Sequence, residues 1–119
     1  MATIEDTLES IMTVDGAIAA ALIDSKSGIV LCWHGNGFDM DTAGAGSTAL
    51  IRAKLKTVKA LKLNDMIEDI LITMGRQYHI IRPVAREPDL FLYLVLDKAR
   101  SNLAIARRFT ANVETEMFN

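Results

Sequence analysis

The stretch that decides the fold is Thr42 to Leu63, TAGAGSTALIRAKLKTVKALKL, which predicts one long central helix. Wound at about 100° per residue, this helix sorts its side chains into three stripes. One stripe is apolar and is expected to cover a sheet; it contains Leu50, Ile51, Leu55, Val58 and Leu61. A cationic stripe lies almost opposite, with Arg52, Lys56 and Lys59 together and Lys62 nearer its edge.

The third stripe contains only small residues, at steps of three, four, four and three: Gly46, Ala49, Ala53, Thr57 and Ala60. Heptad-like spacing without large side chains lets a second helix approach closely. Alanine is also the best helix former and fills positions where nothing else is required. The stripe is therefore either plain helix surface or a seam on which the helix packs against its own copy.

The cationic stripe also has two interpretations, because a run of lysines is usually a solvated face. No acidic residue occurs between Asp41 and Asp65 to neutralise it within the helix. The whole chain carries a formal net charge of -2, so the positive patch is local.

The composition limits the class of protein. A chain of 119 residues that is 50% hydrophobic suits a single domain, residues 1–119, with a substantial core. The sequence pI of about 5.6 argues against nucleic acid as the main partner. Cys32 is the single cysteine and is expected to be reduced in a strand. With acids at the N-terminus and no apolar run of ~18 residues, we expect a cytoplasmic protein without membrane insertion.

The remaining elements follow from apolar spacing and turn residues. Thr3 and Asp6 resemble an N-cap and first turn, which predicts a short helix through Met12. Ala17 to Asp24 and Ile29 to His34 are predicted strands of a hairpin turning at Gly28. Asp41 or Thr42 is expected to cap the central helix. Three further strands, Met66 to Met74, Gln77 to Val84 and Leu90 to Asp97, precede a helix from about Lys98 to Met117.

The last three strands are apolar on both alternations, so both faces of their sheet must be covered. We therefore expect an α/β (α+β) domain of order α-β-β-α-β-β-β-α. Its five-stranded antiparallel sheet would carry the central helix on one face and the terminal helices on the other.

Residues that carry chemistry are few. His34 and His79 are too few and too far apart in sequence to suggest a metal pair. Cys32 and His34 could share a face of a strand, but two-residue spacing does this by geometry alone. Gly44-Ala45-Gly46-Ser47 opens the predicted helix without a phosphate-loop pattern, which favours close packing or helix initiation. Asp39 and Asp41 are too few for a cation cage. No catalytic residue, metal or cofactor is predicted.

The stretch IMTVDGAIAAALIDSKSGIVL resembles the opening of the roadblock family of dynein light chains and their bacterial relatives, including the Mgl-type GTPase regulators. It has a helix leading into Gly16, an alanine-rich strand, a turn from Asp24 to Gly28 and a second strand. The element order of the family matches nearly the whole chain. Family members often have proline where this chain has Asp15. The roadblock fold is similar to longin and profilin domains.

The resemblance implies a homodimer without catalytic residues, acting as a scaffold or regulator of a small Ras-like GTPase. In the family, the strand after the central helix pairs with its copy and the two central helices lie side by side. Carried over, the interface contains the small-residue stripe together with Met66, Glu68, Ile70 and Ile72. Charge geometry makes Arg52, Lys56 and Lys59 candidate GTPase-docking residues. A heterodimer with a paralogue is the alternative to self-pairing.

Two other classes of function are compatible with the sequence. A small-molecule-binding sensor domain of profilin- or longin-like architecture could enclose a ligand among Trp33, Phe38, Tyr78 and Tyr93. An enzyme would have to use Cys32 or His34.

Overall fold

The computed structural model describes residues 3–118 and contains five strands and three α-helices. The order is α1 (Ile4–Ser10), a 3-10 turn at Ile11–Thr13, β1 (Ala17–Asp24), β2 (Val30–Gly35), α2 (Met40–Ala60), β3 (Ile70–Thr73), β4 (Gln77–Pro83), β5 (Leu90–Asp97), a 3-10 turn at Lys98–Arg100 and α3 (Leu103–Met117). This is the predicted order of elements. Among residues 3–118, none of the helices combines the length and apolar character that crossing a membrane requires.

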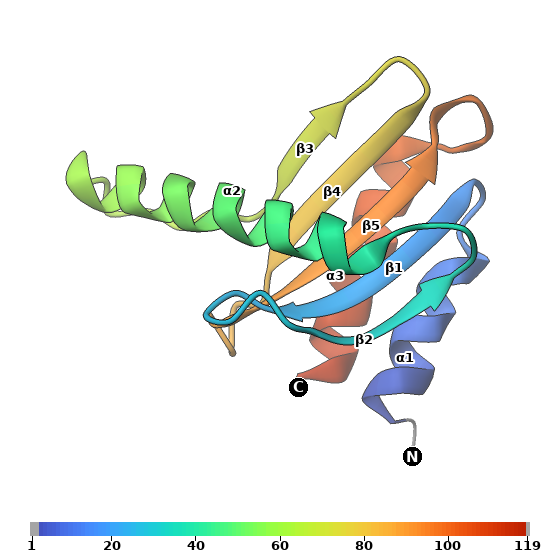
Figure 1. Ribbon diagram of the computed structural model, residues 1–119, viewed down its shortest axis with the longest axis horizontal. Coiled ribbons are helices and arrows are strands. Elements are labelled where there is room, and N and C mark those ends of the chain that lie inside the picture. The colour runs from blue at the N-terminus through green and yellow to red at the C-terminus, as the bar shows by residue number, and fades with distance from the viewer. Residues whose placement is uncertain (1–2, 119) are drawn as a thin grey trace.

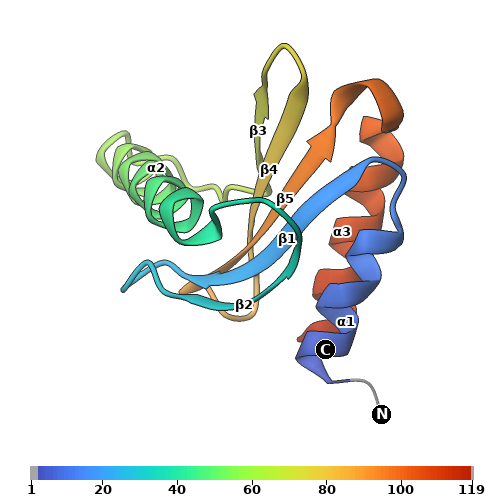
Figure 2. The same cartoon turned by 45° about the vertical axis from the view of Figure 1, so that its right-hand side comes forward.

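The strands form one antiparallel sheet of order β2-β1-β5-β4-β3, which leaves β2 and β3 as its two edges. Helix α2 crosses one face, and α1 and α3 lie side by side on the other (Figures 1 and 2). The predicted three-layer arrangement is confirmed.

Alternation along the central strands divides the core into two layers. On β1, Ala20 and Leu22 face α1 and α3, whereas Ala19, Ala21 and Ile23 face α2. Every residue from Phe91 to Leu96 of β5 is buried, so this strand supplies both layers. The apolar runs on both alternations therefore do mark a sheet that is covered on both faces.

Caps explain where the helices begin. Thr3 and Asp6 form the predicted capping box at α1. The start of α2 differs from the expectation, because Asp39 accepts from the Thr42 amide and Asp41 lies inside the first turn. The predicted C-terminal helix is divided: Asp97 caps a short 3-10 turn, and Asn102 then caps α3.

The predicted strand Met66 to Met74 was too long, since β3 contains only Ile70–Thr73. Ile70 lies opposite Ile81 on β4, so a longer ladder would place Glu68 opposite Pro83. Proline has no N–H to donate to a neighbouring strand. Met66 and Glu68 therefore precede the strand, in an irregular segment that returns from the end of α2.

Candidate functional site

Helix α2 extends beyond the sheet that it covers (Figure 1). Its 21 residues make a rod about 31 Å long, whereas five strands at a spacing of about 4.8 Å span about 19 Å. Its buried residues all belong to the first twelve: Met40, Gly44, Ser47, Thr48 and Ile51. The second half of the helix therefore projects into solvent.

The apolar stripe predicted to cover the sheet is consequently mostly exposed. Only Ile51 is buried, while Leu50 and Leu55 are each 40% exposed and Leu61 is 63% exposed. Val58 is half-buried. The periodicity identified the correct side of the helix for Ile51, but it could not indicate how far the sheet reaches. These leucines form an unpartnered apolar surface on a single copy of the chain.

Gly44 allows the first half of α2 to approach the sheet closely. A Cβ atom at this position would lie 2.9 Å from Cγ2 of Val30 on β2. The prediction that Gly44-Ala45-Gly46-Ser47 opens the helix was wrong, because α2 begins at Met40 and these residues lie within it. Close packing, the favoured interpretation of Gly44, is confirmed.

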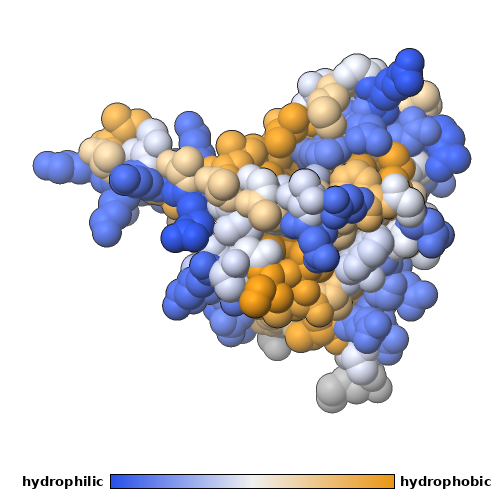
Figure 3. Space-filling view, viewed as in Figure 1, coloured by the Kyte–Doolittle hydropathy of each residue, from blue (hydrophilic) through white to orange (hydrophobic). Residues whose placement is uncertain are grey.

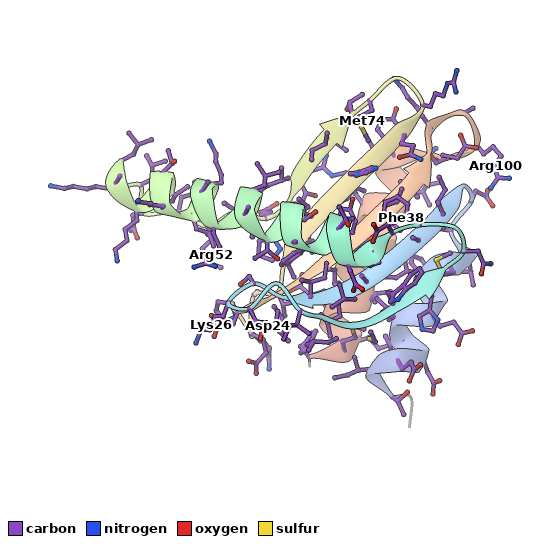
Figure 4. All side chains as sticks on the ribbon, viewed as in Figure 1. Asp24, Lys26, Phe38, Arg52, Met74 and Arg100 are labelled. Atoms are coloured by element: carbon purple, nitrogen blue, oxygen red, sulfur yellow. The ribbon has the colours of Figure 1, made fainter. Side chains whose placement is uncertain are left out.

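The small-residue stripe lies on the outer side of α2. Gly46, Ala49, Ala53, Thr57 and Ala60 are all exposed, and a Cβ at Gly46 would meet no atom within 4 Å. Arg52, Lys56 and Lys59 are exposed on one flank. Figure 4 shows Arg52 on the side of α2 that faces the turn between β1 and β2, where Lys26 and Asp24 are labelled.

The segment between α2 and β3 connects the projecting helix to the sheet edge. Leu63 is 52% exposed and Met66 is 70% exposed. Glu68 is also exposed, and Ile70 and Ile72 on β3 are half-buried. Figure 3 shows apolar side chains along α2 and toward β3. The exposed leucines, the irregular segment and the open edge of β3 thus form one continuous surface.

A groove of about 740 Å³ lies beneath the projecting half of α2. Leu55 and Val58 line one wall, residues 64–68 line the rim, and the other wall follows the end of β4. Arg82 and Glu114 also line it; the Arg82 Nε donates to Glu114 Oε1 at 2.6 Å. Glu114 Oε2 also accepts from the Ala85 amide at 2.9 Å, so both carboxylate oxygens have partners.

Two ion pairs of this region were missed by sequence reasoning. Arg82 with Glu114 and Arg107 with Asp69 each join the sheet, or the segment leading to it, to α3. The partners are 32 and 38 residues apart in sequence, and no local spacing links them.

His79 lies in a hydrogen-bonded chain on the α2 side of the sheet. Its Nδ1 is 2.6 Å from the Tyr93 hydroxyl, and its Nε2 is 2.9 Å from Gln77 Oε1. The neutral ring satisfies both contacts, with Nδ1 accepting from Tyr93 and Nε2–H donating to Gln77. Burial lowers the pKa of His79 and raises that of Tyr93. The arrangement stabilises the sheet beneath Phe38, whose ring meets His79 edge-on.

Cys32 and His34 do face the same side of β2, toward α1, but they do not form a nucleophile and base. His34 Nε2 is 3.2 Å from the backbone oxygen of Glu5, which joins β2 to α1. Burial, followed by the negative charge of Glu5, raises the pKa of the Cys32 thiol. A nucleophilic cysteine needs the opposite shift.

The four aromatic residues considered for a ligand cavity are not brought together. Tyr78 packs in the layer below α1 and α3, with Lys98 Nζ 5.6 Å from its ring centroid. Phe38 and Tyr93 pack in the α2 layer, and Trp33 is 39% exposed on the edge strand. They cannot enclose one ligand, because the sheet separates Tyr78 from Tyr93. Residues 3–118 also contain no group of three or more His, Cys, Asp or Glu side chains arranged to hold a metal ion.

Comparisons with known proteins give the fold. No protein-family model and no curated protein matches the chain. Among solved structures, Myxococcus xanthus MglB is similar with a TM-score of 0.85 and 14% identity over 97% of this chain and 91% of that one. The gliding protein MglB from Thermus thermophilus gives 0.82 and 19% over 96% and 84%.

A Roadblock/LC7 domain from Streptomyces avermitilis is similar with a TM-score of 0.81 and 11% identity, over 97% of this chain and 94% of that one. The likeness extends along the whole chain and includes the layers and strand order described above. The chain therefore has the roadblock fold, as its resemblance to that family predicted.

Proposed function

We propose that the chain is a non-catalytic homodimeric module that regulates or scaffolds a small Ras-like GTPase. The observation that carries this proposal is the projecting half of α2 beside the open edge of β3. A helix longer than its own sheet is wide exposes leucines that a second sheet could cover.

The edge strand gives the geometry of the proposed dimer. β3 pairs with β4 on one side only, so its other side presents unpaired backbone groups. Antiparallel pairing with β3 of a second copy would continue the sheet across a two-fold axis. The projecting Leu55 and Leu61 would then lie above the sheet of the second copy. Ile70 and Ile72 belong to the pairing strand, and Met66 and Glu68 flank it.

The small-residue stripe supports the same arrangement. Its five members, Gly46, Ala49, Ala53, Thr57 and Ala60, are exposed along four turns of α2, and Leu50 lies at its border. Small side chains allow helix axes to approach to about 8 Å, at the close end of the usual range. Self-association also has a parallel among structures of this fold, since one MglB structure is described as having a tetrameric arrangement.

The GTPase assignment rests on the family resemblance, and the basic flank supplies its candidate contact. Arg52, Lys56 and Lys59 are exposed, and none of them makes a salt bridge with another residue of the range 3–118. A local positive patch on a chain of net charge -2 would accelerate association with an acidic partner.

The test combines solution mass with binding. Light scattering over a dilution series should give a stable mass near twice 13.1 kDa. Small Ras-like GTPases of the same organism, loaded with GDP or a non-hydrolysable GTP analogue, are then titrated against the chain. Reversing Arg52, Lys56 and Lys59 to Glu should weaken binding at least tenfold while the mass is retained.

The matched control reverses Arg76, Arg86 and Arg108, which are also exposed and lie outside α2. It changes the net charge by the same amount and should bind normally. Unchanged binding after the α2 reversal would remove the docking assignment. A monomer at every concentration would remove the homodimer.

A further inference from the structure

The second edge of the sheet carries an exposed apolar patch that the proposed dimer does not use. β2 pairs only with β1, and Ile29 and Leu31 are 60% and 53% exposed beside the partly exposed Trp33. Figure 3 shows apolar side chains gathered below α2, over the first half of β2. Exposed apolar edge strands are sites of aggregation unless a partner covers them.

Charge along this edge changes sign from one end to the other. Arg52 lies near the start of β2: a Cβ at Gly28 would be 3.8 Å from Thr48 Oγ1, and Arg52 follows Thr48 by one helical turn. Asp41 lies in the first turn of α2, shortly after β2 ends at Gly35. The two residues share one flank of α2, because the positions between them rotate the helix by about three full turns and rise about 16 Å.

We propose that β2 is a second self-association edge, on which another copy of the chain docks antiparallel. Antiparallel docking about a two-fold axis near Leu31 places Ile29 beside Trp33 of the second copy, joining apolar to apolar. It also places Arg52 opposite Asp41 of the second copy, twice. Parallel docking would bring like charges together, and a uniformly basic or acidic foreign segment would match only one end of the strand.

The local geometry limits the strength of this contact. A register shift between Leu22 and Ile23 of β1 interrupts the ladder at Leu31, whereas Cys32, Trp33, His34 and Gly35 pair regularly with β1. A short edge with three apolar side chains is smaller than the ~1,200–2,000 Å² of stable interfaces. The association is therefore reversible and joins preformed units at high protein concentration. The β2 contact itself does not require the α2 and β3 interface of the proposed function.

The experiment compares four chains by sedimentation over a dilution series: wild type, Leu31→Lys, Ala53→Phe, and the double variant. Wild type should reach masses above the dimer, and Leu31→Lys should raise the concentration needed for them at least tenfold. Ala53→Phe should leave a dimer formed through β2 alone, and the double variant should remain a monomer. Ile105→Lys is the matched control, because Ile105 is 61% exposed on α3, and it should behave as wild type.

Charge exchange tests the antiparallel orientation. Arg52→Asp and Asp41→Lys should each weaken the larger assembly, and the two together should restore it, because each new charge meets its opposite across the contact. Failure of the double exchange to restore the mass would overturn the antiparallel geometry.

The other outcomes separate the two interfaces. If wild type never exceeds the dimer, or if Leu31→Lys leaves the larger masses unchanged, β2 is not a self-association edge and a different molecule covers it. If Ala53→Phe has no effect and Leu31→Lys turns a dimer into a monomer, the β2 inference stands and the α2 and β3 dimer fails.

Discussion

Arg107 on α3 holds the carboxylate of Asp69 through two hydrogen bonds, Nε to Oδ2 at 2.9 Å and Nη2 to Oδ1 at 2.7 Å. Asp69 is the last residue before β3, so this bidentate contact fixes the irregular segment at the point where the edge strand begins. The guanidinium matches the planar carboxylate in both position and charge. The edge proposed to pair with a second copy is thus positioned by the C-terminal helix.

Replacing Arg107 with Ala should lower the free energy of unfolding by about 1 kcal/mol, because the side chain of Arg107 is 46% exposed and solvent screens the pair. Hydrogen exchange should accelerate most at residues 66–70, where the anchor is lost. Arg108→Ala, the neighbouring exposed arginine, is the control and should change neither property. Equal destabilisation by both variants would show that the pair itself contributes nothing.

Most of the fold could be predicted because its signals are local. The run from Leu90 to Asp97 is apolar on both alternations and became the fully covered strand β5, with the predicted bounds. Ala17 to Asp24 was also predicted with the observed bounds, since turn residues delimit it. The end of β3 could not be predicted, because it depends on Pro83 lying opposite Glu68 across the sheet. That relationship exists only once the strands are in register.

The candidate surfaces divide in the same way. The three stripes of α2 follow from helical periodicity, and the small and cationic stripes are exposed as expected. The apolar stripe was assigned to the chain's own sheet, although Leu55 and Leu61 extend past it. Local pattern gives the side of a helix that seeks burial, but it does not state which molecule supplies the cover. The apolar edge at β2 had an available signal in Ile29, Leu31 and Trp33, but only topology shows that β2 is an edge.

Gly44 and Gly46 provide a matched pair for the packing of α2. Gly46→Ala should stabilise the chain by about 0.5–1 kcal/mol, because alanine is the better helix former and its Cβ meets open space. Gly44→Ala gains the same propensity but places a Cβ 2.9 Å from Val30, and overpacking costs about 1–3 kcal/mol. Chemical denaturation should therefore show Gly44→Ala to be the less stable variant by at least about 1 kcal/mol. Equal stabilities would mean that α2 moves away from β2 without penalty.

The stability of the domain should depend on pH through His79. Burial places the pKa of the native His79 below its unfolded value of about 6.5, so between these two values the unfolded chain binds more protons. The contribution of neutral His79 is fully present above about pH 6.5 and is lost as the pH falls toward the native pKa. The loss of stability from about pH 7.5 to about pH 5.5 should be smaller in His79→Gln than in wild type. Parallel pH profiles for the two proteins would contradict this.

Glu114 should be the more sensitive of two acids near the end of α3. Its carboxylate binds Arg82 and the Ala85 amide, and its side chain is 10% exposed. Glu114→Ala would leave the largely buried guanidinium and the amide without their partner, at a cost of about 2–4 kcal/mol. Glu116→Ala removes an exposed acid from the same helix and should change stability by less than about 0.5 kcal/mol. Comparable unfolding midpoints for the two variants would show that the pair does not stabilise the junction of β4 with α3.

Ala53 gives the sharpest test of the proposed helix seam. It is the central member of the small-residue stripe and is exposed on a single copy, so a phenylalanine should not disturb the fold of the monomer. Within a close seam, however, the added ring should cost about 1–3 kcal/mol, which raises the dimer dissociation constant by about fivefold to 150-fold. Ala104→Phe is the control, because Ala104 is an exposed alanine on α3, outside every interface proposed for this chain. Sedimentation of both variants should show weakened dimerisation only for Ala53→Phe; if the two dissociate at the same concentration as wild type, alanine occupies this stripe for helix propensity alone.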